Sequence, residues 1–500
     1  MSQRICIDPI TRLEGHGKIE IFLDERGDVA NAYFQVPELR GFERFCVGRA
    51  AEEMPVITSR ICGVCPEAHH MAAAKALDML FGAEPPPAAR KLRELMYSAF
   101  FVTDHATHFY ALGGPDFIIG PDAPPAERNI LGVIRKVGLE LAREVLDCRA
   151  RNHRAITVLG GRPIHPVAGM PGGWSCSLSE AARSEIETAA RRNIEFALRS
   201  LTLFHSLVLG SQEYSDMMRS DTYCHRTYSL GTVDSRNRVN FYDGTLRVVD
   251  PEGAEFDRFD AAGYRDRITE RVEPWTFLKF PFLSRVGWKG FEDGKDSGVY
   301  TATPLARLNV SDGMATPLAQ EEFERFYETV GSGKANGRYR PVHYRLATHW
   351  ARLVEMLYAA ERMLELATDG EITSPDVRRI PDGIRGIGIG SVEAPRGTLI
   401  HHYETDQQGI LTKVNLVVGT THNYAAMSMS IKKAAQCLIH GGQIVEEGLL
   451  NRIEMAFRLY DPCLSCATHS LPGRMPMEVI VRTADGAPPR SFRRGEGAVL

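Results

Sequence analysis

Two Cys-x-x-Cys pairs near opposite ends of the 500-residue chain constrain its fold more than any other feature. Cys62 and Cys65 stand in the segment RICGVC, and Cys463 and Cys466 stand in the segment DPCLSC. Each pair offers two thiolates to a metal ion, and together they supply four soft ligands. Because roughly 400 residues separate the pairs, a shared metal would require a fold that brings both ends of the chain together.

A zinc ribbon or two independent redox motifs could also account for these cysteines. The two clips of a zinc ribbon usually lie about 15–20 residues apart, so the spacing here disfavours that class. Ten cysteines in 500 residues are also too few for a disulfide-rich scaffold. The remaining six are scattered, and we expect them to be buried apolar thiols. They are Cys6, Cys46, Cys148, Cys176, Cys224 and Cys437.

The composition is that of an ordinary soluble globular protein, with 44% apolar and 24% charged residues. A net charge of −4 argues against a nucleic-acid-binding protein. The first residues contain no charged leader followed by an apolar core, and no stretch of about 20 apolar residues could span a membrane. The sequence therefore predicts a cytoplasmic protein without a membrane span.

Long stretches with apolar residues at three- and four-residue spacing predict helices over 87–112, 126–156, 178–218 and 340–368. A further helix is expected to begin at Pro66, and residues 422–456 also have a helical pattern. Such lengths favour a bundle of long helices over a doubly wound sheet.

Strand-like segments surround this helical region. Residues 4–36 alternate between apolar and polar side chains, and 379–420 combine short apolar runs with Gly-rich turns. Residues 225–315 predict a β-rich insertion with a hairpin around Asp243-Gly244. The expected fold class is therefore α+β and mainly helical, with a central bundle of long helices and small peripheral β-sheets.

The first cysteine clip lies directly before the expected helix start at Pro66. A helix N-terminus carries partial positive charge, which favours the thiolate form of a nearby cysteine. His69 follows Cys65 by four residues, so it could lie one turn along and hydrogen-bond that sulfur. His70 would point about 100° away and is the weaker candidate.

Several separated motifs together resemble the large, catalytic subunit of nickel–iron hydrogenases, over essentially the whole chain. They are DPITRLEGH at 8–16, RGFE at 40–43, RICGVC at 60–65, Asp104-His105, APRG at 394–397, VVGTT at 417–421 and DPCLSCATH at 461–469. The resemblance implies one hydrogenase large-subunit domain over 1–469. It would comprise a β-rich N-terminus (about 1–36), the helical bundle (about 66–218 and 340–368), the insertion (about 225–315) and a C-terminal metal-clip region (about 379–469).

The resemblance also implies a ligand set for a nickel–iron centre. Cys62 and Cys463 would be terminal nickel ligands, whereas Cys65 and Cys466 would bridge nickel to an iron that carries carbon monoxide and cyanide. The cofactor would further be surrounded by His69, Pro395, Arg396, Thr420, Asp104 and Asp461. Of these, Arg396 and Thr420 would donate to the iron's diatomic ligands, and Asp104 and Asp461 would fix Arg396.

The reaction implied by the resemblance is reversible heterolytic cleavage of H2 to protons and electrons. Cys463 would be the base, with Arg396 as the alternative, and Glu14 would relay the proton. From the residues alone, Glu14 could instead form an ion pair with Arg12 or Lys18.

The resemblance implies a separate magnesium site as well. Its ligands would be the Glu43 carboxylate, the Leu416 carbonyl and the His469 side chain. Oxygen ligands suit a hard cation, whereas a histidine ligand is less typical.

Residues 470–500 follow the last motif. The resemblance implies that a maturation endopeptidase removes this extension after His469, once nickel-insertion factors have supplied the metal. The other interpretation is a retained surface hairpin, because residues 475–482 have a strand-like pattern.

Electrons would have to leave through another polypeptide. The chain has no convincing nucleotide-binding loop and too few remaining cysteines for an iron–sulfur cluster. The resemblance therefore implies that the partner is a small iron–sulfur subunit. Details such as His69-His70 and Gly419 resemble the cytoplasmic multi-subunit class, closest to viologen-reducing enzymes or those coupled to heterodisulfide reductase-type subunits, with F420- or NAD-linked relatives as runners-up.

Three other functions fit the sequence less well. A quinone-site subunit of respiratory complex I would lack the four metal cysteines, and a hydrogen-sensing homologue would generally lack the C-terminal extension. A zinc-clipped interaction scaffold is disfavoured by the separation of the two clips.

Overall fold

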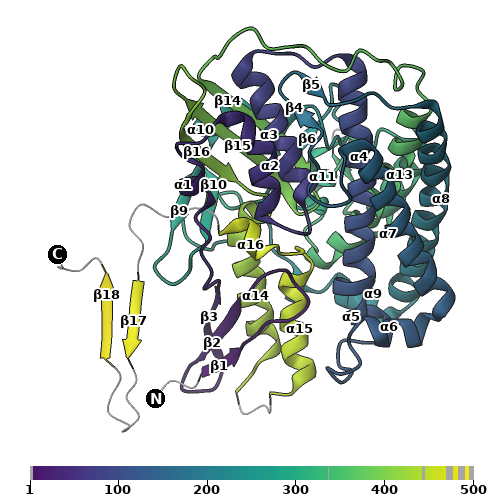
Figure 1. Ribbon diagram of the computed structural model, residues 1–500. Coiled ribbons are helices and arrows are strands. Elements are labelled where there is room, and N and C mark those ends of the chain that lie inside the picture. The colour runs from purple at the N-terminus through teal and green to yellow at the C-terminus, as the bar shows by residue number, and fades with distance from the viewer. Residues whose placement is uncertain (1–3, 336, 442–444, 469–476, 482–489, 495–500) are drawn as a thin grey trace.

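The computed structural model describes residues 4–335, 337–441, 445–468, 477–481 and 490–494. Four long helices form the centre of the fold and stand side by side on the right of Figure 1: α4 (Pro87–Thr107), α7 (Leu139–Gly160), α8 (Glu180–Phe204) and α13 (Thr348–Ala367). Helix α13 packs against both α4 and α8, and most of its residues are buried. A helix buried on nearly all sides marks the middle of a bundle. The expected α+β class with a central helical bundle is confirmed.

Three of the long predicted helices are interrupted. The stretch expected over 126–156 divides into α6 (Ile130–Val137) and α7 at Gly138, whose φ of 91° is incompatible with a right-handed helix. The stretch over 178–218 comprises α8, a π-helical turn over His205–Leu209 and α9 (Gln212–Met218). Helix α4 likewise passes into a π-helical turn over His108–Gly113. Such turns, with i→i+5 hydrogen bonds, widen the helix locally and shift the register of the residues that follow.

The N-terminal sheet confirms the strand pattern of residues 4–36. Strands β1 (Arg4–Ile7), β2 (Lys18–Leu23) and β3 (Val29–Gln35) form an antiparallel sheet in that order. Helix α14 (Tyr424–Leu438) packs against β3 and against α15 (Glu447–Arg458), low in the view of Figure 1. The N-terminal sheet and the helices that precede the second cysteine clip therefore lie in one part of the fold.

The hairpin expected around Asp243-Gly244 is wrong. Strand β7 (Thr245–Val249) pairs instead with β6 (Tyr228–Val233), and the chain reverses near Asp234. The Asp234 carboxylate accepts hydrogen bonds from the backbone N–H groups of Arg236 and Arg238, at 2.8 and 2.9 Å. An aspartate that binds its own downstream backbone is a strong turn former, and here it outcompetes the Asp-Gly pair.

The Gly-rich segment before the APRG motif is a packing surface. Strand β14 (Ile387–Ala394) pairs with β15 (Gly397–Thr405), which pairs with β16 (Leu411–Val417), and α3 (Pro66–Phe81) lies against β14. A Cβ atom at Gly390 would come within 2.4 Å of the backbone of Ala72 and Ala76. These glycines therefore allow α3, which follows the first cysteine clip, to lie directly on the sheet.

The remaining elements pack around this frame, and two of the strands, β8 and β11, complete a four-stranded sheet in the order β11-β6-β7-β8. The helices are α1 (Phe42–Cys46), α2 (Met54–Thr58), α5 (Pro115–Ile118), α10 (Tyr264–Arg267), α11 (Pro304–Val310), α12 (Pro317–Val330) and α16 (Leu464–Ala467). The strands are β4 (Gly169–Met170), β5 (Gly173–Trp174), β8 (Glu255–Phe259), β9 (Ile268–Val272), β10 (Lys279–Leu283), β11 (Tyr300–Thr301), β12 (Lys334–Ala335), β13 (Arg338–Tyr339), β17 (Met477–Val481) and β18 (Arg490–Arg494). Strands β17 and β18 pair antiparallel and are drawn apart from the main body in Figure 1.

The expected burial of the six isolated cysteines is only partly correct. Cys46 and Cys148 are buried, Cys6 and Cys176 are exposed, and Cys224 and Cys437 are intermediate. Cys6 lies on β1, which pairs with only one neighbouring strand and leaves Cys6 open to solvent. Among the described residues, no helix combines the length and apolarity needed to cross a bilayer.

Buried neutral histidines make the fold acid-sensitive. Burial lowers the pKa of His70 and of His105 to about 4, and it lowers the pKa of His108, His225 and His349 well below the usual value. The unfolded chain binds these protons from about pH 6.5 downward, so stability is full above pH 6.5 and is lost as the pH falls toward 4. Each such histidine should lower the free energy of unfolding by about 1.4 kcal/mol for every pH unit between 6.5 and 4.

We therefore expect the melting temperature to fall steeply between pH 6.5 and 4, as measured by thermal unfolding across pH. The carboxyls of Glu67 and Asp104 act in the opposite direction, because burial raises the pKa to about 8 for Glu67 and about 6 for Asp104, but the histidines outnumber them. His70→Gln can keep the contacts to Pro55 and Gly169 without titrating. The free energy of unfolding that this variant loses between pH 6.5 and 4 should therefore be smaller than that of the parent by about 3 kcal/mol. Identical acid profiles for His70→Gln and the parent would contradict this account.

Candidate metal centre

The fold brings all four clip cysteines into one buried cluster. The sulfur atoms of Cys62, Cys65, Cys463 and Cys466 all lie within 4.8 Å of one another. Cys62 lies 3.2 Å from Cys463, Cys65 lies 3.2 Å from Cys466, and Cys463 lies 3.1 Å from Cys466, measured between sulfur atoms. The two ends of the chain therefore contribute equally to one four-thiolate site.

Helix starts and strand-like pairing place the two clips. Cys65 directly precedes α3, which begins at Pro66 as expected, and Cys463 directly precedes α16. The Glu14 backbone lies alongside the second clip: its N–H donates to the Pro462 carbonyl at 3.3 Å, and its carbonyl accepts from the Leu464 N–H at 2.9 Å. The positive end of α3 favours thiolates at the first clip. The N-terminal motif thus holds the C-terminal clip in place.

The donor set fits a soft, thiophilic metal centre. Burial raises the pKa of the Cys463 and Cys466 thiols well above the usual value, so a cation is needed to hold them as thiolates. Thiolate sulfur is the donor that nickel and iron accept in such sites. The chemistry of the cluster therefore agrees with a nickel–iron centre.

Arg396 lies beside the cluster between two carboxylates. Its guanidinium is 3.0 Å from an Asp104 oxygen and 3.0 Å from an Asp461 oxygen, and all three side chains are at most 5% exposed. Burial alone would lower the pKa of Arg396, but the charges of Asp104 and Asp461 raise it well above the usual value. Arg396 is therefore held protonated, and the predicted association of these three residues is present.

Unsatisfied polar atoms around this ion pair indicate room for further ligands. Arg396 Nε and Asp104 Oδ1 are buried without a hydrogen-bond partner. The Thr420 hydroxyl lies next to the second clip and accepts from the Cys463 N–H at 3.1 Å. Buried polar atoms are normally paired, so these donors and acceptors fit a polar group that binds against them.

Glu14 contacts the second clip through its side chain. Its Oε2 lies 3.0 Å from Cys463 Sγ and accepts from the Ser465 N–H at 3.1 Å. The alternative ion pairs are wrong because both candidate cations have other partners: Arg12 pairs with Asp116 and Lys18 pairs with Glu20. Glu14 therefore lies where a proton leaving the Cys463 sulfur would first meet a carboxylate.

A cavity of about 280 Å³ adjoins the site. Glu14, Asp104, Arg396 and Asp461 line it on the side of the cluster. The cavity also reveals Glu67, a buried carboxyl on the first turn of α3 that no motif indicated, and burial raises the pKa of Glu67 to about 8. Its position directly after the clip and Pro66 was the only sequence signal.

The two histidines after the first clip have different partners. His70 is turned away, with Nδ1 3.0 Å from the Pro55 carbonyl and Nε2 accepting from the Gly169 N–H at 2.8 Å. His69 Nδ1 lies 3.1 Å from His401 Nε2. The bond from His69 to the Cys65 sulfur stays a prediction.

Two of the three residues expected at the magnesium site lie side by side. The Glu43 carboxylate on α1 accepts from the Leu416 N–H on β16 at 2.7 Å. His469 lies outside the described residues.

Comparisons with known proteins agree with this geometry. Residues 40–129 and 298–469 match the family described as "Nickel-dependent hydrogenase", and residues 4–39 match a family described as "HoxL-like". The chain is 47% identical over 484 residues to an iron-sulfur subunit of the F420-non-reducing hydrogenase of Archaeoglobus profundus, covering 97% of this chain and 98% of the relative.

Two further similarities extend this result. The chain is 36% identical to the beta subunit of the NAD-reducing hydrogenase HoxS of Cupriavidus necator, covering 97% of this chain and 98% of the relative. A crystal structure of an NAD+-reducing [NiFe]-hydrogenase in the H2-reduced state superimposes with a TM-score of 0.85 at 37% identity, covering 93% of this chain and 99% of that one.

Proposed function

Because this chain belongs to the nickel-dependent hydrogenase family and is the catalytic large subunit of a nickel–iron hydrogenase, we propose specific roles for the residues of its metal centre. Cys62 and Cys463 would hold nickel as terminal ligands, and Cys65 and Cys466 would be shared between nickel and an iron that would carry carbon monoxide and cyanide. The observation that supports this most directly is the convergence of four buried sulfur atoms from opposite ends of the chain.

The cofactor, when bound, polarises H2 and accepts its two electrons, and the protein handles the protons. Cys463 Sγ is the base that receives the first proton, and Glu14 Oε2, 3.0 Å away, takes it onward. Arg396 is the less suitable base, because Asp104 and Asp461 keep it protonated. A base must lose its own proton before it can accept another, and the two carboxylates oppose that loss.

Arg396, Pro395 and Thr420 would surround the diatomic ligands of the iron. Asp104 and Asp461 offset the charge of Arg396, whose burial would otherwise cost several kcal/mol. Its remaining N–H groups can then donate toward the cofactor.

A magnesium ion near the C-terminal clip is part of the same proposal. Its ligands are the Glu43 carboxylate, the Leu416 carbonyl and His469. The contact between Glu43 and the Leu416 backbone supports this placement, because it puts a carboxylate beside that residue.

The extension over 470–500 is removed by a maturation endopeptidase after nickel insertion. The family match ends at residue 469, which is consistent with a mature protein that ends at His469. The alternative is a retained surface hairpin, and the pairing of β17 with β18 is compatible with it.

Electrons pass first to a small iron–sulfur subunit, then to further electron-transfer subunits of a cytoplasmic complex. We propose partners of the heterodisulfide reductase type, and the similarity to a subunit of an F420-non-reducing hydrogenase favours an acceptor other than F420. The alternative is an NAD- or F420-linked partner, of which the similarity to an NAD-reducing hydrogenase supports the NAD-linked form.

Infrared spectroscopy of the purified complex tests the cofactor directly. We expect bands from iron-bound carbon monoxide and cyanide, and these bands should shift when H2 replaces argon. Bands that shift without multiple turnovers would indicate a hydrogen sensor instead. Zinc in place of nickel and iron, with no such bands, would overturn the assignment and favour a zinc-clipped interaction scaffold.

A further inference from the structure

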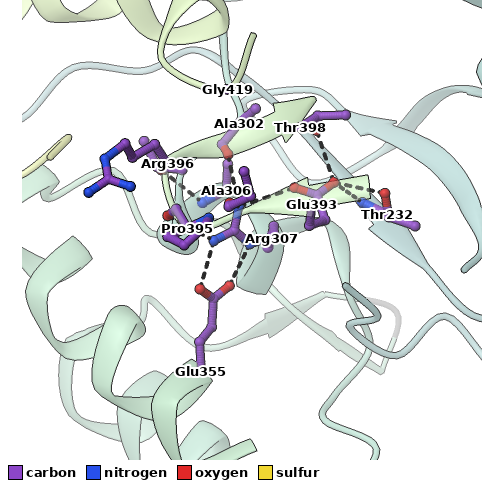
Figure 2. A network of polar contacts seen from close by, with 12 residues as sticks. Thr232, Ala302, Ala306, Arg307, Glu355, Glu393, Pro395, Arg396, Thr398 and Gly419 are labelled. Atoms are coloured by element: carbon purple, nitrogen blue, oxygen red, sulfur yellow. Dashed lines mark hydrogen bonds and ion pairs between the residues drawn. The ribbon is translucent and has the colours of Figure 1, made fainter. Parts of the chain in front are cut away.

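Arg396 lies on a two-residue turn between β14 and β15 of the sheet formed by β14, β15 and β16. Strands β14 and β15 pair down to Ala394 and Gly397, so Pro395 and Arg396 alone form the turn. The Arg396 guanidinium lies 3.0 Å from Asp104 and 3.0 Å from Asp461, and its side chain extends away from Arg307 (Figure 2). The position of the guanidinium therefore depends on how firmly the backbone of a tight turn is held.

Three consecutive carbonyl groups of this turn are bound by buried side chains. Arg307 donates to the Ala394 carbonyl at 2.9 Å and to the Pro395 carbonyl at 3.2 Å. The Asn423 side-chain amide donates to the Arg396 carbonyl at 2.7 Å. Backbone carbonyls in a hairpin turn usually face water, so this arrangement is a specific constraint on the turn.

Arg307 is itself fixed on every side. Its Nε and Nη2 donate to the two oxygens of Glu355 at 2.6 and 2.7 Å, and its Nη1 donates to Glu393 at 3.1 Å. All three side chains are 0% exposed. With the two turn carbonyls, the five N–H groups of the guanidinium all have acceptors, as Figure 2 shows. A planar, fully bonded guanidinium cannot rotate without breaking several hydrogen bonds.

The carboxylates that hold Arg307 are anchored in turn. Glu393 accepts from the Thr232 N–H and hydroxyl at 2.8 Å each, and from the Thr398 hydroxyl at 2.9 Å. Glu355 on α13 lies 3.0 Å from His105 Nε2. The network therefore connects three parts of the fold. They are the β14-β15-β16 sheet, the sheet that contains β6, and the helical bundle.

Helix α4 closes the network into a ring. Asp104 binds the Arg396 guanidinium, and the next residue, His105, binds Glu355, which holds Arg307. Helix α4 thus holds the Arg396 side chain through Asp104. Through His105 and Glu355 it also holds Arg307, which supports the turn. Displacing the turn would strain both contacts.

We propose that Arg307 is a positioning residue for hydrogen turnover, which fixes the Pro395-Arg396 turn so that the Arg396 guanidinium is held against the metal centre. This inference rests on the role proposed above for Arg396. Burying one arginine with two glutamates contributes little net stability, because desolvation offsets most of the attraction. The ion pairs instead fix the position of the turn, because a side chain at a reacting centre must be held within about 0.5 Å of its productive position.

Arg307→Lys provides the first test, because lysine keeps the charge but its three N–H groups cannot reach three carboxylate oxygens and two carbonyls together. We expect turnover to fall about 100-fold, the cost of roughly 1 Å of misplacement, while nickel content stays at the parent level. A crystal structure of the variant should show the Arg396 guanidinium displaced and the four sulfur positions unchanged. The matched control is Arg93→Lys: Arg93 is also 0% exposed, binds both oxygens of Asp78 and donates to two backbone carbonyls, away from the cluster.

The double variant Arg307→Lys/Arg396→Lys separates positioning from general stability. If Arg307 acts through Arg396, Arg307→Lys should cause no further loss once Arg396 is already lysine. Equal fold-losses in both backgrounds would overturn the proposal, and so would an unmoved Arg396 in the crystal structure. If Arg396→Lys alone keeps the parent rate, the role of Arg396 fails instead.

Asn423→Ala gives an independent test if Arg307→Lys does not fold. It releases the Arg396 carbonyl, together with the Gly419 carbonyl and the Ala302 N–H that the same amide binds, and it removes no buried charge. We expect a smaller loss of turnover that also disappears in the Arg396→Lys background. A loss that persists there would contradict positioning through the turn.

Discussion

Replacing Cys62 or Cys466 by serine should give a folded protein that retains no nickel and has no hydrogenase activity. Serine is nearly isosteric with cysteine, but its hydroxyl is a harder donor and stays protonated near neutral pH. Each of these sulfur atoms lies within 4.8 Å of the other three, so the site loses a quarter of its ligands with little change of shape. Metal analysis and H2 oxidation assays with an artificial acceptor would measure both losses.

The two variants should differ in their iron content. If Cys466 bridges the two metals, Cys466→Ser should lose iron together with nickel. If Cys62 binds nickel alone, Cys62→Ser should retain more iron than Cys466→Ser. Cys148→Ser is the matched control, because Cys148 is also buried but lies beside Asn152 and Asn193, outside the cluster. Nickel retention and full activity in Cys62→Ser or Cys466→Ser would refute the ligand assignment.

The parts of the site that could be predicted from the sequence are those carried by short contiguous motifs. The two clips, Glu14 and Arg396 each lie within such a motif, and their joint order pointed to one family and thus to one site. The relation of Arg396 to Asp104 and Asp461 came from the same resemblance. Periodicity alone would have left Glu14 in an ion pair with Arg12 or Lys18, which the structure excludes.

The support of the site could not be predicted in this way. Arg307 lies 48 residues from Glu355 and 86 from Glu393, and no local pattern connects an arginine on a short helix with glutamates on a distant helix and strand. Such pairs are selected by tertiary packing, which a single sequence does not display. Glu67 was missed for a similar reason, since only the fold shows that the first turn of α3 is buried.

The predictions of local structure are wrong where polar side chains or positive backbone φ angles override the periodicity of apolar residues. The helix expected over 126–156 is divided by one glycine with positive φ, although the apolar spacing continues on both sides. The chain reverses at Asp234 and not at Asp243-Gly244 because the Asp234 carboxylate binds the backbone that follows it. Composition alone does not show which of these two turn-forming sites is used. The long helices themselves were predictable because their apolar faces repeat over many turns.

Replacing Glu14 by glutamine should leave the metal centre assembled and reduce turnover by about 10²–10⁴-fold, the usual contribution of a group that transfers protons. Glutamine is the same size and can still accept from the Ser465 N–H, so the pairing of the N-terminal segment with the second clip should survive. It cannot carry a proton away from the Cys463 sulfur, which lies 3.0 Å from the carboxylate. Nickel content should therefore match the parent, whereas H2 oxidation and exchange of D2 with solvent protons should both fall.

Two further measurements make this test specific to proton transfer. Conversion of para- to ortho-hydrogen needs cleavage of H2 but no release of protons to solvent, so Glu14→Gln should keep much of that activity. Glu20→Gln is the matched control, because Glu20 lies on β2, directly after the loop that carries Glu14, and pairs with Lys18 and Arg4 outside the site. Parent rates of solvent exchange in Glu14→Gln would return Glu14 to a structural role, in which its backbone alone holds the second clip. Loss of para–ortho conversion with nickel retained would instead mean that Glu14 acts on the cleavage step itself.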